Sequence, residues 1–117
     1  MILTTGKEQC ARILMGDSLY YWKYIQLGTD NTAETLADTA LVAEVLEASA
    51  TVAFASPNIV RLTYTWTFVA PYSLKEAGVA NKAVASTPAM LTRKTYTAVP
   101  VYIGDIMAVT WDVAVSA

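Results

Sequence analysis

The stretch NIVRLTYTWTF, residues 58–68, decides the fold. Its large apolar side chains occupy every second position, at Val60, Leu62, Tyr64, Trp66 and Phe68. The positions between them hold Ile59, Arg61, Thr63, Thr65 and Thr67. A period of two places successive side chains on opposite faces of an extended chain. The stretch therefore predicts a half-buried strand of an antiparallel sheet, with one heavy face in the core and a threonine-rich face outward.

Similar strand signals lie on both sides of this stretch, at residues 19–27, 73–80, 89–98 and 105–115. One face of the last carries Met107, Val109, Trp111, Val113 and Val115. The segment 41–47 fits either a helical turn or a strand leading into 50–55. Six or seven short strands separated by turn-rich loops predict a mainly β fold, an antiparallel β-sandwich that is jelly-roll-like or barrel-like. A meander packed under a helix is the alternative.

Residues 4–15 predict a short α-helix ahead of the strands. Thr5 and Glu8 have the spacing of a capping box, and Gly16 supplies a stop signal. Cys10, the only cysteine, falls on the apolar face of this helix and is expected to act as a small hydrophobic side chain. A chain of 117 residues has the length of one domain. We expect a single β-sandwich domain over residues 1–117, with the helix at about 4–15 and the strands within about 19–115.

The composition excludes several classes of function. The chain has no histidine and one cysteine, so it lacks Ser-His-Asp and Cys-His pairs, histidine-ligated zinc and a disulfide framework. A net charge of −2 disfavours nucleic acid, which needs a basic face. The longest charge-free stretches are too short to span a bilayer. We therefore expect no enzymatic activity, no cofactor, no nucleic-acid partner and no membrane partner.

The polar segment 28–39 is the best candidate for a metal site. Its oxygen-bearing side chains are Asp30, Asn31, Glu34 and Asp38. Calcium takes oxygen ligands from such loops, but the spacing matches no EF-hand. A solvated loop with local Asx turns is the favoured interpretation, so we expect no metal, with Asp30 and Asp38 as weak candidates.

Four further carboxylates lie on or beside the expected strands: Glu44, Glu76, Asp105 and Asp112. Two that met in space would support acid–base or glycosidic chemistry. No spacing in the sequence forces such a meeting. Glu76, which precedes Ala77-Gly78, is interpreted as a structural charge near a strand bend.

An aromatic cluster at 20–24 raises the question of an interface. Consecutive residues of a strand point to opposite faces, so these rings cannot all enter one core. Tyrosine and tryptophan are enriched in interfaces. We predict an interface at Tyr20, Tyr21, Trp22 and Tyr24, extended from loops by Tyr72 and Tyr102. The alternative is that the helix covers one face of the strand and the second sheet covers the other.

An ordered set of segments resembles small structural proteins of tailed bacteriophages. The segments are YIQLGTDNTAETLADTALVAEVLEA (24–48), SLKEAGV (73–79), LTRKTY (91–96) and AVTWDV (108–113). The likeness covers roughly residues 22–115. Relatives often carry longer insertions where this chain has the short stretch 80–88, and we expect no additional domain for receptor binding.

The resemblance implies a virion protein, made in the host cytoplasm and located in the virion. Its size points to a capsid decoration or cement protein that binds and stabilises the phage head lattice. The expected partners are phage capsid or other virion proteins and further copies of the chain, in a homo-oligomer for which a trimer is favoured. The alternative function is a tail, collar, baseplate or fibre component that acts as an adapter or as a receptor- or glycan-binding module.

Overall fold

Alternating apolar residues produce the strands that the sequence predicts. The computed structural model describes residues 2–14, 22–81 and 89–114. Its elements are α1 (Thr4–Leu14), β1 (Tyr24–Gly28), β2 (Glu44–Ser49), β3 (Thr51–Ser56), β4 (Ile59–Thr67), β5 (Tyr72–Asn81), β6 (Ala89–Val101) and β7 (Ile106–Ala114). The ambiguous segment 41–47 leads into strand β2. The first strand begins later than predicted, at Tyr24, while residues 19–21 lie outside the described part of the chain.

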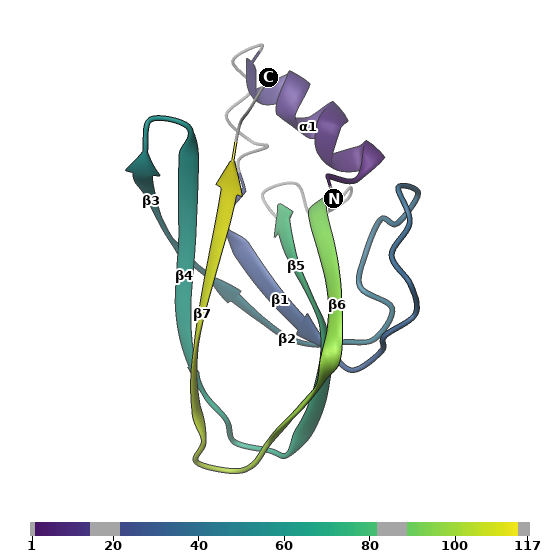
Figure 1. Ribbon diagram of the computed structural model, residues 1–117, viewed down its shortest axis with the longest axis vertical. Helices are drawn as coiled ribbons and strands as arrows, with labels where there is room; N and C mark the ends of the chain where they lie inside the picture. Colours follow the sequence, from purple (N-terminus) through teal and green to yellow (C-terminus); the bar gives the residue numbers. More distant parts are fainter. Residues whose placement is uncertain (1, 15–21, 82–88, 115–117) are drawn as a thin grey trace.

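The strands form two antiparallel sheets, as Figure 1 shows. Sheet A has the order β2-β1-β5-β6, and sheet B has the order β3-β4-β7. The chain changes sheet between β2 and β3, between β4 and β5, and between β6 and β7. The prediction of an antiparallel β-sandwich is confirmed. The sandwich is open rather than a closed barrel, and these crossings exclude the simple meander.

The main core lies between the inner faces of the two sheets. Sheet A contributes Ile25, Leu27, Leu74, Ala77 and Val79, and sheet B contributes Leu62, Trp66 and Phe68. The predicted inward face of 58–68 is therefore confirmed at these three positions. Tyr64, on the same face, is partly exposed and lies edge-on to Trp66, with 4.6 Å between ring centroids. Trp111 is half-buried because β7 is an edge strand.

The segment 29–43 covers the outer face of sheet A, and α1 lies across one end of the sandwich (Figure 1). A second apolar cluster forms there from Leu3, Leu41, Ala80 and Met90, with Tyr24 packed against it. The Leu3 N–H donates to the Leu91 carbonyl at 2.8 Å and so holds the start of α1 against β6. Gly6 permits this approach, since a Cβ there would lie 2.6 Å from the Leu91 carbonyl oxygen.

Two features predicted for the helix are the capping box at Thr5 and the apolar position of Cys10. The Thr5 side chain is outside the described part, so the capping box remains a prediction. Cys10 is a free cysteine, half-buried against the main core, in agreement with a hydrophobic role. No helix among the described residues is long and apolar enough to cross a membrane.

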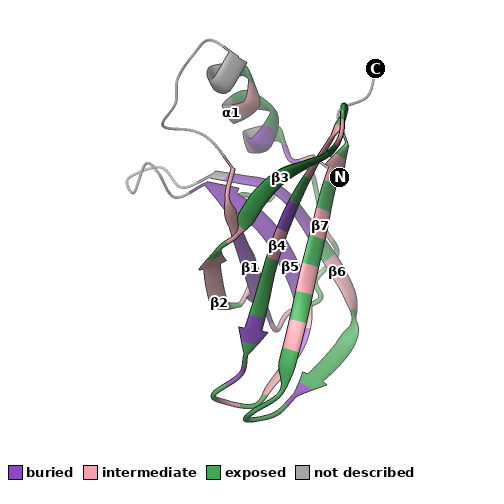
Figure 2. Ribbon diagram, turned by 90° about the vertical axis from the view of Figure 1, so that its left-hand side faces the viewer, coloured by how far each residue is buried: buried purple, intermediate pink, exposed green. Residues whose placement is uncertain are grey.

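Sheet B is much less covered than sheet A, as the burial colours of Figure 2 make plain. Residues 51–55 of β3 are all exposed, whereas residues 25–28 of β1 are all buried. Segments of similar apolar character thus have opposite environments within one molecule.

Candidate functional site

The most polar region of the interior is a buried ion pair between β5 and β6. Glu76 and Arg93 both have fully buried side chains, and Arg93 Nε lies 3.0 Å from Glu76 Oε1. Strand register brings them together, because β5 pairs Gly78 with Arg93 and Glu76 with Thr95. The register shifts between Leu74 and Glu76, which supports the interpretation of Glu76 as a structural charge near a strand bend. We call Glu76 and Arg93 the clamp.

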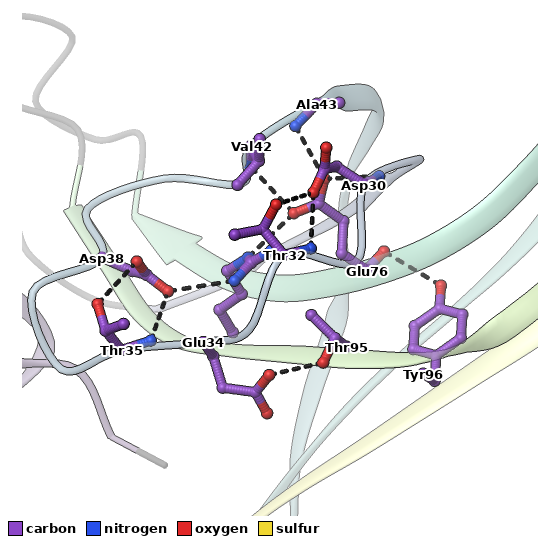
Figure 3. A network of polar contacts seen from close by, with 11 residues as sticks. Asp30, Thr32, Glu34, Thr35, Asp38, Val42, Ala43, Glu76, Thr95 and Tyr96 are labelled. Atoms are coloured by element: carbon purple, nitrogen blue, oxygen red, sulfur yellow. Dashed lines mark hydrogen bonds and ion pairs between the residues drawn. The ribbon is translucent and has the colours of Figure 1, made fainter.

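Glu76 binds both ends of the segment 29–43, as Figure 3 shows. Its carboxylate accepts hydrogen bonds from the backbone N–H groups of Val42 at 3.0 Å, Ala43 at 2.8 Å and Asp30 at 3.3 Å. Gly28 leaves the space for this carboxylate, since a Cβ there would lie 2.5 Å from Glu76 Oε2. A buried charge is tolerated when it is paired and hydrogen-bonded, and Glu76 meets both conditions.

Arg93 holds the middle of the same segment. Its Nη1 lies 3.2 Å from Asp38 Oδ2, and Asp38 also accepts from the Thr35 N–H at 3.0 Å and the Thr35 hydroxyl at 3.1 Å. The pKa of Asp38 lies below its usual value, mainly because of the Thr35 N–H, with help from the Thr35 hydroxyl and Arg93. Arg93 Nη2 is buried and has no hydrogen-bond partner among the residues that the structure describes.

Three motifs of the phage resemblance supply the three charged members of this network. Asp38 comes from residues 24–48, Glu76 from 73–79 and Arg93 from 91–96. Sequence reasoning noted each motif but not their meeting. The residues shared with that pattern thus include those that fasten the segment 29–43 to sheet A.

The acidic residues of the segment 28–39, the candidate calcium ligands, have nearby hydrogen-bond donors. Asp30 Oδ1 accepts from the Thr32 N–H at 2.7 Å and the Thr32 hydroxyl at 2.5 Å, an Asx turn that lowers the Asp30 pKa. Glu34 accepts from the Thr95 hydroxyl at 2.6 Å, which lowers the Glu34 pKa. Within residues 2–14, 22–81 and 89–114, no group of acidic or cysteine side chains is arranged to hold a metal ion.

The carboxylates considered for acid–base chemistry have separate locations. Asp112 forms a two-pronged pair with Arg61 at 2.8 and 3.0 Å on sheet B, and this guanidinium lowers the Asp112 pKa. Asp105 accepts from the Tyr102 N–H at 2.8 Å in the β6–β7 loop. Glu44 is exposed on β2, and Glu76 belongs to the clamp. The geometry therefore suits structural roles for Glu76, Asp105 and Asp112.

The predicted aromatic interface divides into two groups. Trp22 and Tyr24 are half-buried near the end of sheet A where β5 finishes, since Tyr24 pairs with Ala80. Tyr72 and Tyr102 lie at the opposite end, where Tyr72 pairs with Val101. About 26 Å of extended strand separates Ala80 from Tyr72. Tyr20 and Tyr21 lie outside the described residues.

The group at the far end belongs to a larger apolar surface. The Phe68 N–H donates to the Asp105 carbonyl at 2.9 Å, and the Gly104 N–H donates to the Phe68 carbonyl at 2.8 Å. These bonds join the β4–β5 and β6–β7 loops. The joined loops expose Val69, Tyr102, Ile103 and Ile106, which we call the apolar tip.

A glycine with a left-handed backbone shapes this tip. Gly104 has a φ of +90°, a conformation that glycine adopts without steric cost. The turn is closed by the Asp105 N–H, which donates to the Tyr102 carbonyl at 3.0 Å. Sequence reasoning identified Tyr102 but missed Val69, Ile103 and Ile106. Isoleucines on both sides of the Gly104-Asp105 turn were the available signal.

A cavity of about 510 Å³ lies between the sheets on the side where β6 and β7 form their edges. Tyr96 and Val99 of β6 line it, together with Met107, Val109 and Trp111 of β7. The two edges face one another across this space, and no strand of the described part of the chain lies between them. Sequence reasoning did not foresee the cavity, because periodicity does not reveal how far apart two sheets stand.

A comparison with protein-family models, curated proteins and solved structures found no match to this chain. The function is therefore inferred from the residues and their arrangement.

Proposed function

We propose that the chain is a structural protein of a tailed-phage virion, and that it decorates the capsid as a cement protein. Two observations support the proposal. The ordered motifs resemble those of small virion proteins, and the apolar tip presents four large side chains at one end of the sandwich. The tip is the observation that carries it, because exposed apolar patches of this kind mark protein–protein contacts.

The tip has the properties of an attachment surface. Val69 is 83% exposed and Ile103 is 73% exposed, so both are available to a partner. The backbone bonds between the loops hold the surface in one shape, which lowers the entropy cost of binding. Repeated attachment to a capsid lattice would then raise the overall avidity without any single strong site.

The polar groups fit this passive role. The clamp and Asp38 use their hydrogen-bonding capacity to hold the segment 29–43. We accordingly propose a non-enzymatic protein whose partners are capsid or other virion proteins, located in the virion. Nucleic acid and membrane are not among the proposed partners.

The experiment is a binding assay on phage heads that lack this protein. Heads are mixed with purified protein and sedimented, and the bound fraction is measured. We expect Val69→Asp and Ile103→Asp to lose most of the binding because they place charge in an apolar contact. Leu36→Asp is the matched control, since Leu36 is also exposed but its carbonyl bonds to Thr4 at the α1 end.

Two results would contradict the proposal. Failure of the unmodified protein to bind heads would refute a capsid role. Labelled protein located on the tail in images of intact particles would replace it with the tail, collar, baseplate or fibre alternative.

A further inference from the structure

Sheet B ends in two strand edges that no described strand covers. Its order β3-β4-β7 leaves β3 and β7 at the edges, while β2 and β6 are the edges of sheet A. An uncovered edge offers backbone N–H and C=O groups to any extended chain of suitable shape. Proteins that remain single therefore protect such edges with charge, proline, bulges or a covering segment.

Both edges of sheet A carry charged residues or proline, whereas β3 carries neither. The residues are Glu44 and Glu47 in β2 and Lys94 and Pro100 in β6, while Asp112, the one charged residue of β7, is paired with Arg61 of β4. The edge of β6 is also bonded by Leu3. In contrast, no charged residue occurs between Glu47 and Arg61, and β3 reads TVAFAS. Its one irregularity is a register shift between Phe54 and Ser56, near its end.

The apolar side chains of β3 lie on the face that elsewhere forms the core. Val52 pairs with the buried Leu62, and Phe54 pairs with Val60, so both occupy the inner face of sheet B. Phe54 is nevertheless 84% exposed, because sheet A does not extend over it. The side chain is thus a core residue in orientation and a surface residue in exposure.

The opposite edge of the same sheet has the complementary shape. Beside β7 lies the cavity of about 510 Å³, which is larger than one phenylalanine side chain. Val109 and Trp111 face it from the inner side of sheet B and are only half-buried. A strand added to this edge would place its inner-face side chains directly over the cavity.

We propose that β3 of one copy of this chain pairs with the β7 edge of a second copy and inserts Phe54 into the cavity. Both strands run antiparallel to β4, so head-to-tail repetition pairs them in parallel. Each copy then contacts one neighbour through its β3 edge and the other neighbour through its β7 edge. Where the rotation between copies closes, head-to-tail contacts form a ring, which the trimer favoured from the sequence would be, and no edge of sheet B then stays open.

This inference rests on the proposed function, since it names the self-association that would accompany attachment to a lattice. The two use different surfaces. The apolar tip contacts the capsid, whereas β3 and β7 contact other copies. A protein that binds heads as a monomer would overturn the inference alone, and an oligomer that binds no heads would overturn the function alone.

The test measures the native mass of the full chain by sedimentation. We expect the unmodified protein to form an oligomer and Phe54→Asp to sediment as a monomer of 12.6 kDa. Val69→Asp is the matched control because Val69 is 83% exposed, close to the 84% of Phe54, and lies on the tip. It should remain oligomeric. A monomeric unmodified protein at sub-millimolar concentration, or an oligomeric Phe54→Asp, would overturn the proposal.

A mixing experiment identifies the partner edge. Val109→Lys blocks the cavity, and its long side chain can extend to water, so the fold should persist, as circular dichroism would check. We expect Phe54→Asp and Val109→Lys each to be monomeric, and their mixture to form a dimer through the remaining intact β3 and β7 edges. A mixture that stays monomeric would refute the head-to-tail contact. An oligomeric Val109→Lys would also refute it and would indicate that β3 pairs with β3.

Discussion

The outer face of sheet A and the edge strand β3 of sheet B differ in how far their side chains are covered. On sheet A, the charged clamp is fully buried, because the segment 29–43 covers it and supplies its partners. On sheet B, the uncharged strand β3 is exposed along its length, and Phe54 has almost no cover. Burial in this molecule therefore follows the available cover rather than hydrophobicity. The chain covers the outer face of sheet A by itself, whereas sheet B is the part that we propose is completed by a second copy.

Removal of Arg93 gives the strongest test of the covered side. Arg93→Met leaves Glu76 buried without its cation, which costs about 3–5 kcal/mol of unfolding free energy. The matched control is Arg61→Met, which breaks the exposed pair with Asp112 and should cost no more than about 1 kcal/mol. Denaturant melts measure both. Equal losses of unfolding free energy in the two variants would show that the buried clamp contributes no more to stability than an exposed ion pair.

Replacement of two tryptophans contrasts the closed core with the open edge. Trp66→Ala should destabilise the monomer by about 3–5 kcal/mol, because Trp66 is 6% exposed. The symmetry of the sequence pattern predicts a similar loss for Trp111→Ala. Because Trp111 is only half-buried in the structure, we expect a smaller loss of unfolding free energy for Trp111→Ala than for Trp66→Ala. Denaturant melts at low protein concentration measure which of the two variants loses more stability. A larger loss for Trp111→Ala would be evidence against an open β7 edge.

Substitution of Gly28 tests how closely the segment 29–43 fits on sheet A. A Cβ at this position would lie 2.5 Å from Glu76 Oε2 and 2.7 Å from the Ala43 carbonyl oxygen. Gly28→Ala should therefore cost about 1–3 kcal/mol, as overpacking usually does. Proteolysis within 29–43 should also become faster. Unchanged stability and an unchanged rate of cleavage would mean that the Glu76 side chain and the segment 29–43 can move enough to accommodate the added methyl group.

Acid gives the smallest expected effect. The pKa values of Asp30, Glu34 and Asp38 are lowered, mainly by hydrogen bonds from Thr32, Thr95 and Thr35 respectively. A carboxylate with a lowered pKa stabilises the folded state above its unfolded-state pKa of about 4, and that contribution is lost as the pH falls below this value.

The consequence is selective loosening of the covered side in acid. We expect the exchange of amides in 29–43 to accelerate below a pH of about 4, whereas exchange within β4 changes little. The variant Asp38→Asn should show a weaker acceleration. Loosening that occurs as the pH rises instead would contradict the assignment of these carboxylates.

Much of the fold could be predicted because its strands follow a strict period of two. The alternation at 58–68 gives β4 and its inward face, and the helix follows from its apolar spacing, whereas the stop signal at Gly16 lies outside the described residues. The clamp could not be predicted as a unit. Glu76 and Arg93 are 17 positions apart, and their meeting depends on the register of β5 against β6. The aromatic residues could be identified but not grouped, because strand order places Tyr24 and Tyr72 at opposite ends of sheet A. Phe54 was missed because alternation gives the face of a side chain but not whether a facing sheet reaches it.

Hydrogen exchange in β3, measured on dilute and on concentrated protein, tests the central contrast most directly. In dilute protein, we predict fast exchange of the outward-pointing amides of β3 and slow exchange in β1 and β5. In concentrated protein, the amides of β3 and β7 should become protected together, while those of β1 and β5 stay unchanged. Protection of β3 that is already complete at high dilution, or fast exchange of β3 within a stable oligomer, would contradict a sheet B that is completed by a second copy.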